Sequence, residues 1–230
     1  MAIINVENGE EKMKENKLKS LSEAISGIKD NSSIMIGGFM GCGSPKSLID
    51  EVVKSGVQNL LVISNDTDFE GVGVGKLIAT GQIAKLIASH IGTNPQTGKR
   101  INTGELKAEL NPQGTLVERI RAGGAGLGGV LTPTGIGTII ENGKQKIIVC
   151  EKTYLLETPL RADFALVKAY KGDISGNLVF RGSGRNFNLV MATAADYVIA
   201  EVEECREVGK IDPEEVMLPG IFIDAVVQGV

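Results

Sequence analysis

The sequence predicts an α/β fold with one open, mostly parallel, twisted sheet that is flanked by helices. Apolar runs of roughly four to seven residues, the usual length of buried strands, alternate with segments that have helical periodicity. Glycine makes up 30 of 230 residues and clusters beside these runs, which indicates tight loops on a rigid scaffold. We expect a single domain over 18–230. It follows an N-terminal arm over 1–17, in which lysines alternate with glutamates.

The N-terminal half of this domain is predicted to contain three strands and three helices. Ser44 and Pro45 have the residue types of an N-cap and a first helical position, and Gly56 is a typical helix end. In order, we expect a helix from 19 to near Asp30-Asn31, a strand over 33–39, a helix over 45–56, a strand over 58–66, a short helix after 75 and a strand over 84–90.

The C-terminal half continues the alternation with less regular spacing. The region over 91–145 is rich in loop-forming residues, and we expect it to hold an insertion or an active-site lid. In order, we expect a strand before a turn at 112–114, a helix over Thr115–Arg121, a hairpin turning at Asn142-Gly143, a strand over 163–170, a hairpin turn at 175–177, a helix after 188 that runs into a strand, and a final strand over 219–229.

Composition excludes several functional classes. A net charge of −4 argues against nucleic-acid binding, and no apolar stretch approaches the ~20 residues that span a bilayer. The N-terminus lacks the pattern of a signal peptide, and the three cysteines form no CxxC pair, so we expect a cytoplasmic protein. With His90 as the only histidine, a multi-histidine metal centre cannot be built from this chain.

The segment "DNSSIMIGGFMGCGSP" places a glycine loop, 37–43, between a strand and a helix start. It does not match a Walker A loop, because no lysine directly follows Gly43, and its glycine order is not that of a Rossmann fingerprint. One interpretation is that the glycines only allow close packing. The interpretation that we favour is a ligand site, where backbone N–H groups and a helix N-terminus receive an anion or a carbonyl oxygen.

This segment also resembles the signature of class I coenzyme A transferases. The resemblance continues through "LLVISNDTDF", "ASHIGTNPQTGKR", "LNPQGTLVERIRAGGAG", "LTPTGIGT", "GNLVFRGSGRNFN" and "LPGIFIDAVVQG", and so covers 18–230. The chain is similar to alpha (A) subunits of the acetate/acetoacetate/butyrate type. The resemblance implies transfer of CoA from an acyl-CoA to a short-chain carboxylate or 3-oxo acid, with a beta subunit as partner in a heterotetramer or larger assembly. It implies no permanently bound cofactor, because CoA and acyl-CoA are substrates.

The resemblance also implies roles for particular residues. The nucleophile of this family is a glutamate in a Ser-Glu-Asn-Gly motif of the beta subunit. Glu141, in "IIENG", lacks the preceding serine, so we do not expect it to be that nucleophile. Gln113 is expected to donate to the oxyanion, and Asn65 to contact substrate or intermediate, although Asn65 could equally cap a turn. CoA binding is expected at Gly37, Gly38, Phe39, Met40, Gly41, Cys42 and Gly43.

Other interpretations stay open at the level of sequence. A CoA- or nucleotide-binding regulatory module would use the same scaffold without a catalytic partner. A self-sufficient hydrolase or isomerase would need Glu141 or His90 as its reactive group. The glycine-rich segment 123–129 is either a mobile loop or a closely packed crossing. Four arginines could meet CoA phosphates or form salt bridges: Arg119, Arg121, Arg181 and Arg185.

Overall fold

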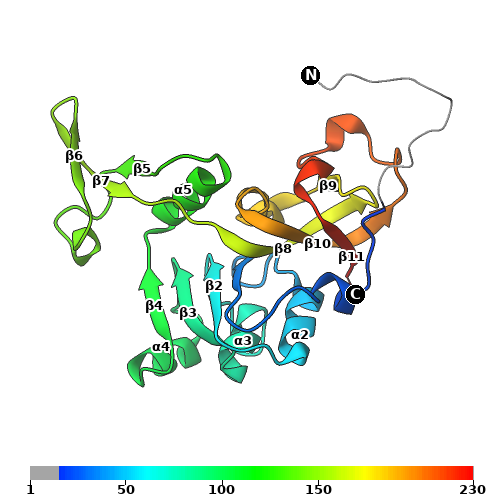
Figure 1. Cartoon of the computed structure of the whole chain (residues 1–230), viewed down its shortest axis with the longest axis horizontal. Coiled ribbons are helices and arrows are strands. Elements are labelled where there is room, and N and C mark those ends of the chain that lie inside the picture. The colour runs from blue at the N-terminus through cyan, green and yellow to red at the C-terminus, as the bar shows by residue number, and fades with distance from the viewer. Residues whose placement is uncertain (1–15, 230) are drawn as a thin grey trace.

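The computed structural model describes residues 16–229 and contains a central eight-stranded sheet (Figure 1). Seven strands follow the order β11-β10-β8-β1-β2-β3-β4, all pairs in that order are parallel, and the short β9 pairs antiparallel with β8. The predicted fold class is confirmed. The strands are β1 Ser33–Ile36, β2 Leu60–Ser64, β3 Ile83–Ala88, β4 Lys107–Leu110, β8 Ala162–Asp173, β9 Leu178–Val179, β10 Ala195–Arg206 and β11 Ala225–Gln228.

Helices cover both faces of this sheet. Successive side chains of β1 point to opposite faces, so Met35 packs with α5 and α6, while Ile34 and Ile36 pack with α2 and α3. Coverage of both faces explains why the strands are unbroken apolar runs in the sequence. The helices are α1 Leu21–Ala24, α2 Lys46–Ser55, α3 Val74–Thr80, α4 Pro95–Asn102, α5 Gln113–Gly124 and α6 Asn188–Met191.

Three helix boundaries differ from the predictions. The helix expected to reach Asp30 ends as α1 at Ala24 and continues as separate turns, and Asn31 has a φ of 69°. Ser44 does not cap α2, because its hydroxyl donates to Asp68 and Pro45 occupies the cap position. The expected end at Gly56 is confirmed, with a φ of 73°.

The third boundary concerns α5, which begins at Gln113, directly after Pro112. The predicted turn over 112–114 is therefore the first turn of the helix. The helix also runs on to Gly124, because Gly123 and Gly124 let it approach its neighbours closely. A Cβ on Gly123 would lie 1.9 Å from the carbonyl oxygen of Leu160. At these two positions the glycines are a packed crossing rather than a loop.

The expectation of a loop-rich insertion over 91–145 is wrong in its position. Residues 95–124 contain α4, β4 and α5, all of which belong to the main body. The part that projects from the body is a three-stranded antiparallel sheet further along the chain (Figure 1). We call it the extension: β5 Val130–Thr132, the 3-10 helix η1 Ile139–Glu141, β6 Lys146–Val149 and β7 Lys152–Glu157.

The hairpin of the extension also turns at an unexpected place. Val149 pairs with Lys152, so Cys150 and Glu151 form the turn, with φ of 48° and 61°. Asn142-Gly143, the predicted turn, instead follows η1. A two-residue hairpin turn needs positive φ at both residues, which Asn-Gly adopts at lowest cost. Here the antiparallel pairing of β6 with β7 decides the position.

The termini of the described chain lie together. Residues 1–15, most of the predicted arm, are outside the described residues. Lys17 and Leu18 run beside β11, where Leu18 pairs with Val226, so these two residues belong to the folded body (Figure 1). Among the helices of residues 16–229, none is long and apolar enough to cross a membrane.

Candidate functional site

The candidate site lies where β1 and β2 end and α5 begins. In Figure 1 the arrowheads of β2, β3 and β4 point toward α5, so the loops after these parallel strands meet the start of that helix. A pocket of about 440 Å³ opens there, and it joins Asn65 after β2, Gln113 on α5 and two residues of the glycine loop. Its lining consists of Phe39, Cys42, Asn65, Gln113, Gly114, Val117, Ser183, Asn186 and Phe187.

Asn65 and Gln113 are in direct contact. The Gln113 side-chain amide donates to Oδ1 of Asn65 at 2.9 Å, and the Ser89 hydroxyl donates to the same oxygen at 2.7 Å. Ser89 also donates to the backbone carbonyl of Asn65, which fixes the strand end. Asn65 is 2% exposed. The two amides that the sequence singled out are thus one hydrogen-bonded unit at the wall of the pocket.

The N–H groups of the glycine loop are not free for a ligand over most of its length. Gly37 donates to the carbonyl of Leu166, Gly38 to Oδ1 of Asn186, and Phe39 and Cys42 donate to each other's carbonyls. The remaining two donors of this stretch, the N–H groups of residues 40 and 41, bind carboxylates. The expectation that the N–H groups of 37–42 receive an anion is therefore wrong.

Two buried aspartates anchor this loop. Asp66 accepts from the N–H of Met40 at 2.9 Å, and Asp68 accepts from the N–H of Gly41 at 2.7 Å. Asp68 also accepts from the N–H of Val74, so it joins the loop to the first turn of α3. Burial, together with the neighbouring Asp68 carboxylate, raises the pKa of Asp66 to about 6. These carboxylates hold the loop from the side of β2.

Close packing explains several of the loop's glycines. A Cβ on Gly37 would lie 1.8 Å from Oδ1 of Asn188, and a Cβ on Gly43 would lie 2.5 Å from the carbonyl oxygen of Gly184. Gly38 and Gly43 have φ of +119° and +70°, which side chains other than glycine rarely adopt. Met40 and Cys42 remain exposed. The packing interpretation of the glycines is supported at these positions, and the exposed rim is what a ligand can touch.

The other predicted reactive residues lie outside the pocket. Glu141 belongs to the extension, where it accepts from the N–H of Gly137 and pairs with Lys146; these two contacts lower its pKa. His90 lines neither this pocket nor the adjoining cleft. Cys42 does line the pocket, and its sulfur lies 3.4 Å from the Ser183 hydroxyl. The described residues that line the pocket contain no carboxylate.

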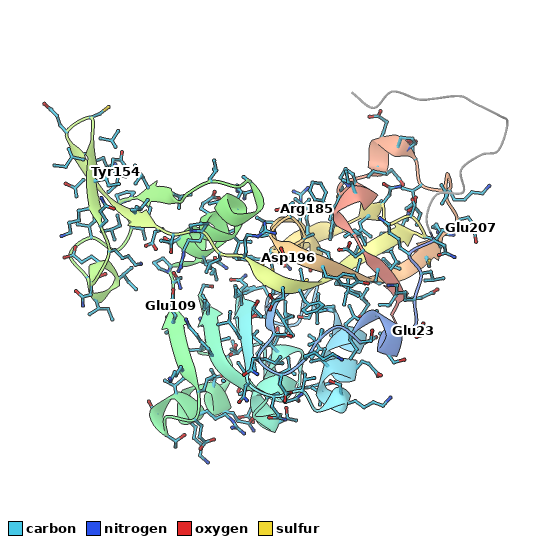
Figure 2. All side chains as sticks on the ribbon, viewed as in Figure 1. Glu23, Glu109, Tyr154, Arg185, Asp196 and Glu207 are labelled. Carbon is cyan, nitrogen blue, oxygen red and sulfur yellow. The ribbon has the colours of Figure 1, made fainter. Side chains whose placement is uncertain are left out.

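Two of the four arginines have structural partners. Arg119 is buried and binds Glu109 at 2.6 Å, Asn111 at 2.7 Å and the carbonyl of Thr158 at 2.8 Å; Figure 2 places Glu109 at the end of β4, beneath α5. Although burial alone would raise the pKa of Glu109, hydrogen bonds from Arg119 and Asn111 hold it below its ordinary value. Arg121 pairs with Glu118 on the surface of α5.

Sequence reasoning missed four side chains that shape the site. Ser89 orients Asn65, Asn186 binds the glycine loop, and Asp66 and Asp68 anchor it. The signal for the aspartates was present in "SNDTD", since both directly follow a strand that ends at the ligand-binding edge of the sheet. Asn186 has no local signal, because it reaches the loop from about 150 residues away through the tertiary fold.

Comparisons with known proteins agree with this geometry. Residues 18–229 match a family model described as Coenzyme A transferase. The chain is 50% identical over 211 residues to the acetate CoA-transferase subunit alpha of Escherichia coli K12, covering 92% of this chain and 96% of that protein. It is 53% identical over 201 residues to the acetoacetyl-CoA:acetate/butyrate CoA transferase alpha subunit of Clostridium acetobutylicum, covering 87% and 92%.

A solved structure shares the fold. The crystal structure of an acyl-CoA transferase from E. coli O157:H7, in a thioester complex with CoA, matches with a TM-score of 0.82 at 23% identity. The match covers 92% of this chain and 47% of that one.

Proposed function

Because the chain belongs to the coenzyme A transferase family, we propose that it is the alpha subunit of a heteromeric enzyme that moves CoA from an acyl-CoA to a short-chain carboxylate or 3-oxo acid. The named relatives support acetate, butyrate and acetoacetate as acceptors. CoA and acyl-CoA are substrates, and no cofactor is held permanently. No clustered metal ligands occur among residues 16–229, and the proposed chemistry uses none.

The observation that carries this proposal is a pocket with amide donors and no carboxylate. Exchange of a thioester for a carboxylate without ATP uses a nucleophile that holds the acyl group and then CoA, and a glutamate carboxylate does this. The lining of the pocket supplies Gln113 and Asn65 but no such group. The nucleophilic glutamate is therefore placed on a beta subunit, and its attack is assisted from this chain.

The proposed reaction has two halves. The partner's glutamate attacks the thioester carbonyl, and collapse of the tetrahedral oxyanion expels CoA thiolate and leaves an acyl-glutamyl anhydride. The thiolate then attacks the glutamyl carbonyl, which releases the first carboxylate and forms a glutamyl-CoA thioester. The second carboxylate reverses these steps, so the kinetics are ping-pong.

Gln113 is proposed as an oxyanion donor in each step. Its amide nitrogen carries two hydrogens, and one of them is held by Asn65 at 2.9 Å. That bond fixes the plane of the amide and leaves the second hydrogen for a developing negative charge in the pocket. A donor that is already oriented needs no reorganisation during the reaction, which is what makes such groups effective.

Asn65 is proposed to orient Gln113 and to meet the substrate at the wall of the pocket. The CoA arm is proposed to lie along the exposed rim of the glycine loop, at Phe39, Met40 and Cys42. The glycines 37, 38, 41 and 43 keep this rim close to the body.

A partner surface is supported by the extension. Ile139 is 83% exposed and Ile148 is 73% exposed, which is unusual for large apolar side chains on a monomeric protein. We propose that the assembly is a heterotetramer or larger, and that 18–230 folds as one domain in each copy. The three cysteines are free thiols, two of them exposed, which supports a reducing cytoplasm.

Co-expression tests the proposed function. The chain is produced alone and together with a beta subunit that contains Ser-Glu-Asn-Gly, and exchange between acetyl-CoA and butyrate or acetoacetate is measured. We expect the two chains to purify together and only the complex to exchange. Full exchange by this chain alone would contradict the division of labour. Tight CoA binding by the isolated chain, with no exchange in the complex, would favour a regulatory module.

A further inference from the structure

A second cleft, of about 510 Å³, adjoins the pocket on the other side of the glycine loop. The pocket and this cleft share two lining residues, Cys42 and Ser183, whose side chains lie 3.4 Å apart at the boundary. The floor of the cleft is formed by Lys168 and Tyr170 of β8 and by Glu203 of β10. Its walls are the segment from Gly41 to Lys46 and the segment from Phe180 to Gly184.

The two cavities differ in charge. The pocket is lined by neutral residues, whereas the cleft is lined by three cations, Lys46, Lys168 and Arg181, and a single anion, Glu203. Arg181 is 3.9 Å from Glu203, so their attraction is weak. The cleft therefore carries an excess of positive charge.

Two of the three cations are held in place by the fold. The Arg181 guanidinium stacks on the ring of Tyr170, with 4.1 Å from Cζ to the ring centroid. The Lys168 ammonium is 2.8 Å from Oε1 of Glu201, a fully buried carboxylate whose other oxygen accepts from the N–H of Leu48 in the first turn of α2. Glu201 is thus shared between Lys168 and the helix N-terminus, which leaves Lys168 with positive charge that faces the cleft.

We propose that this cationic cleft binds the phosphate groups of acyl-CoA, so that the thioester end points into the pocket beside Gln113. The inference rests on the proposed function and adds the orientation of the substrate and the side chains that set it. A CoA thioester has an uncharged acyl-pantetheine arm and a polyanionic nucleotide end. Only one placement puts the anionic end among the cations and the neutral arm in the neutral pocket.

The test compares two substrates in the complex with the beta subunit. Acetyl-CoA carries the phosphates, and acetyl-pantetheine has the same reacting end without the nucleotide. The variant is the double substitution Lys46→Ala with Arg181→Ala; Lys168 is left intact because its partner Glu201 is buried. We expect KM for acetyl-CoA to rise about tenfold, with kcat/KM for acetyl-pantetheine unchanged.

Two further variants sharpen the result. Arg185→Ala removes an exposed arginine of the same segment that does not line the cleft, and it should leave both substrates unaffected (Figure 2). Glu203→Gln removes the one anion of the lining and should change KM for acetyl-CoA in the opposite direction, lowering it about twofold.

The proposal is overturned if the double variant leaves KM for acetyl-CoA unchanged. It is also overturned if activity with acetyl-pantetheine falls by the same factor, since the change would then act on the protein rather than on phosphate recognition. In both cases the wild-type complex still exchanges CoA, so the proposed function survives. A wild-type complex that is inactive with every acyl-CoA would instead reject the proposed function.

Discussion

Asn65 links the strand end, the helix start and the pocket at the scale of single residues. Its Oδ1 accepts from both Gln113 and Ser89, so the position of Gln113 depends on the place where β2 stops. The sequence placed Asn65 between a substrate contact and a turn-capping role. The structure indicates a third role, as the group that orients Gln113.

Replacing Gln113 with alanine is expected to lower kcat of the complex by about 10²-fold, because a preoriented oxyanion donor is lost. Steady-state exchange between acetyl-CoA and butyrate measures it. Gln58→Ala is the matched control, since Gln58 lies exposed before the amino end of β2 and binds only the carbonyl of Gly56. A loss of less than threefold at Gln113 would remove this residue from the chemistry.

Asp66 predicts a pH dependence of stability. In the native protein its pKa is raised to about 6 from 3.8, by burial and by Asp68. The native state therefore holds this proton more tightly than the unfolded chain. The contribution of Asp66 to stability is fully present below pH 3.8 and is lost as the pH rises through 6.

Asp66→Asn keeps an acceptor for the N–H of Met40 but cannot ionise. We expect the variant to gain stability relative to the wild type as the pH rises from 4 to 7, by up to ~3 kcal/mol. Urea unfolding at several pH values measures the difference. Asp196→Asn, in an exposed pair with Arg161, is the control and should change by less than about 1 kcal/mol. A constant difference for Asp66→Asn across this range would contradict the raised pKa.

At the scale of elements, the glycine loop is a packed junction between β1 and α2. Its N–H groups are committed to the protein, and Asn186 and Asn188 brace it from the opposite side. The pattern strand, glycine loop, helix correctly located the ligand-binding edge. It misassigned the purpose of the glycines, because hydrogen-bond partners from distant segments are invisible in a local motif.

Gly37→Ala is expected to destabilise the chain by ~2 kcal/mol or more, since the added Cβ would lie 1.8 Å from Oδ1 of Asn188. That oxygen also accepts from the N–H of Lys168, so its displacement breaks a second contact. Chemical denaturation measures the change.

The matched control is Gly98→Ala in α4, where nothing lies within 4 Å of the added Cβ and φ is ordinary. This substitution should stabilise by about 0.5–1 kcal/mol, because alanine is the better helix former. Equal effects of the two substitutions would contradict the packing account of Gly37.

Element boundaries deviated where contacts outside the element decide them. The first turn of α5 absorbed Gln113, and α5 continued through Gly123-Gly124 because Leu160 and Thr193 lie against it. The hairpin of the extension turned at Cys150-Glu151 rather than at Asn142-Gly143, since the pairing of β6 with β7 outweighed turn propensity.

At the scale of the whole molecule, Lys17 ties the start of the described chain to its end. Its ammonium donates to the carbonyls of Gly220 and Ile223 at 2.8 and 2.7 Å, and its backbone bonds to Ile174 and Val226 (Figure 1). These contacts close the β11 edge of the sheet, where Leu18 pairs with Val226.

Lys17→Ala should therefore destabilise the chain by about 1–3 kcal/mol, because two charge-assisted hydrogen bonds are lost. The free energy of unfolding in urea measures it. Lys54→Ala, at a lysine whose side chain is 78% exposed, should change stability by less than about 0.5 kcal/mol. A negligible effect at Lys17 would indicate that the terminal segment does not hold the sheet edge.

The sequence by itself determined the fold class, the family, the strand that ends at Asn65 and the importance of Gln113. These follow from periodicity and from motifs that are local in the chain. The tertiary structure decided the partners of each group: Asn65 for Gln113, two aspartates for the glycine loop and Glu201 for Lys168. It also decided the charge contrast between the pocket and the cleft. Hydrogen bonds and burial depend on which segments meet in space, and parallel strands joined by long crossovers bring together residues that no local pattern connects.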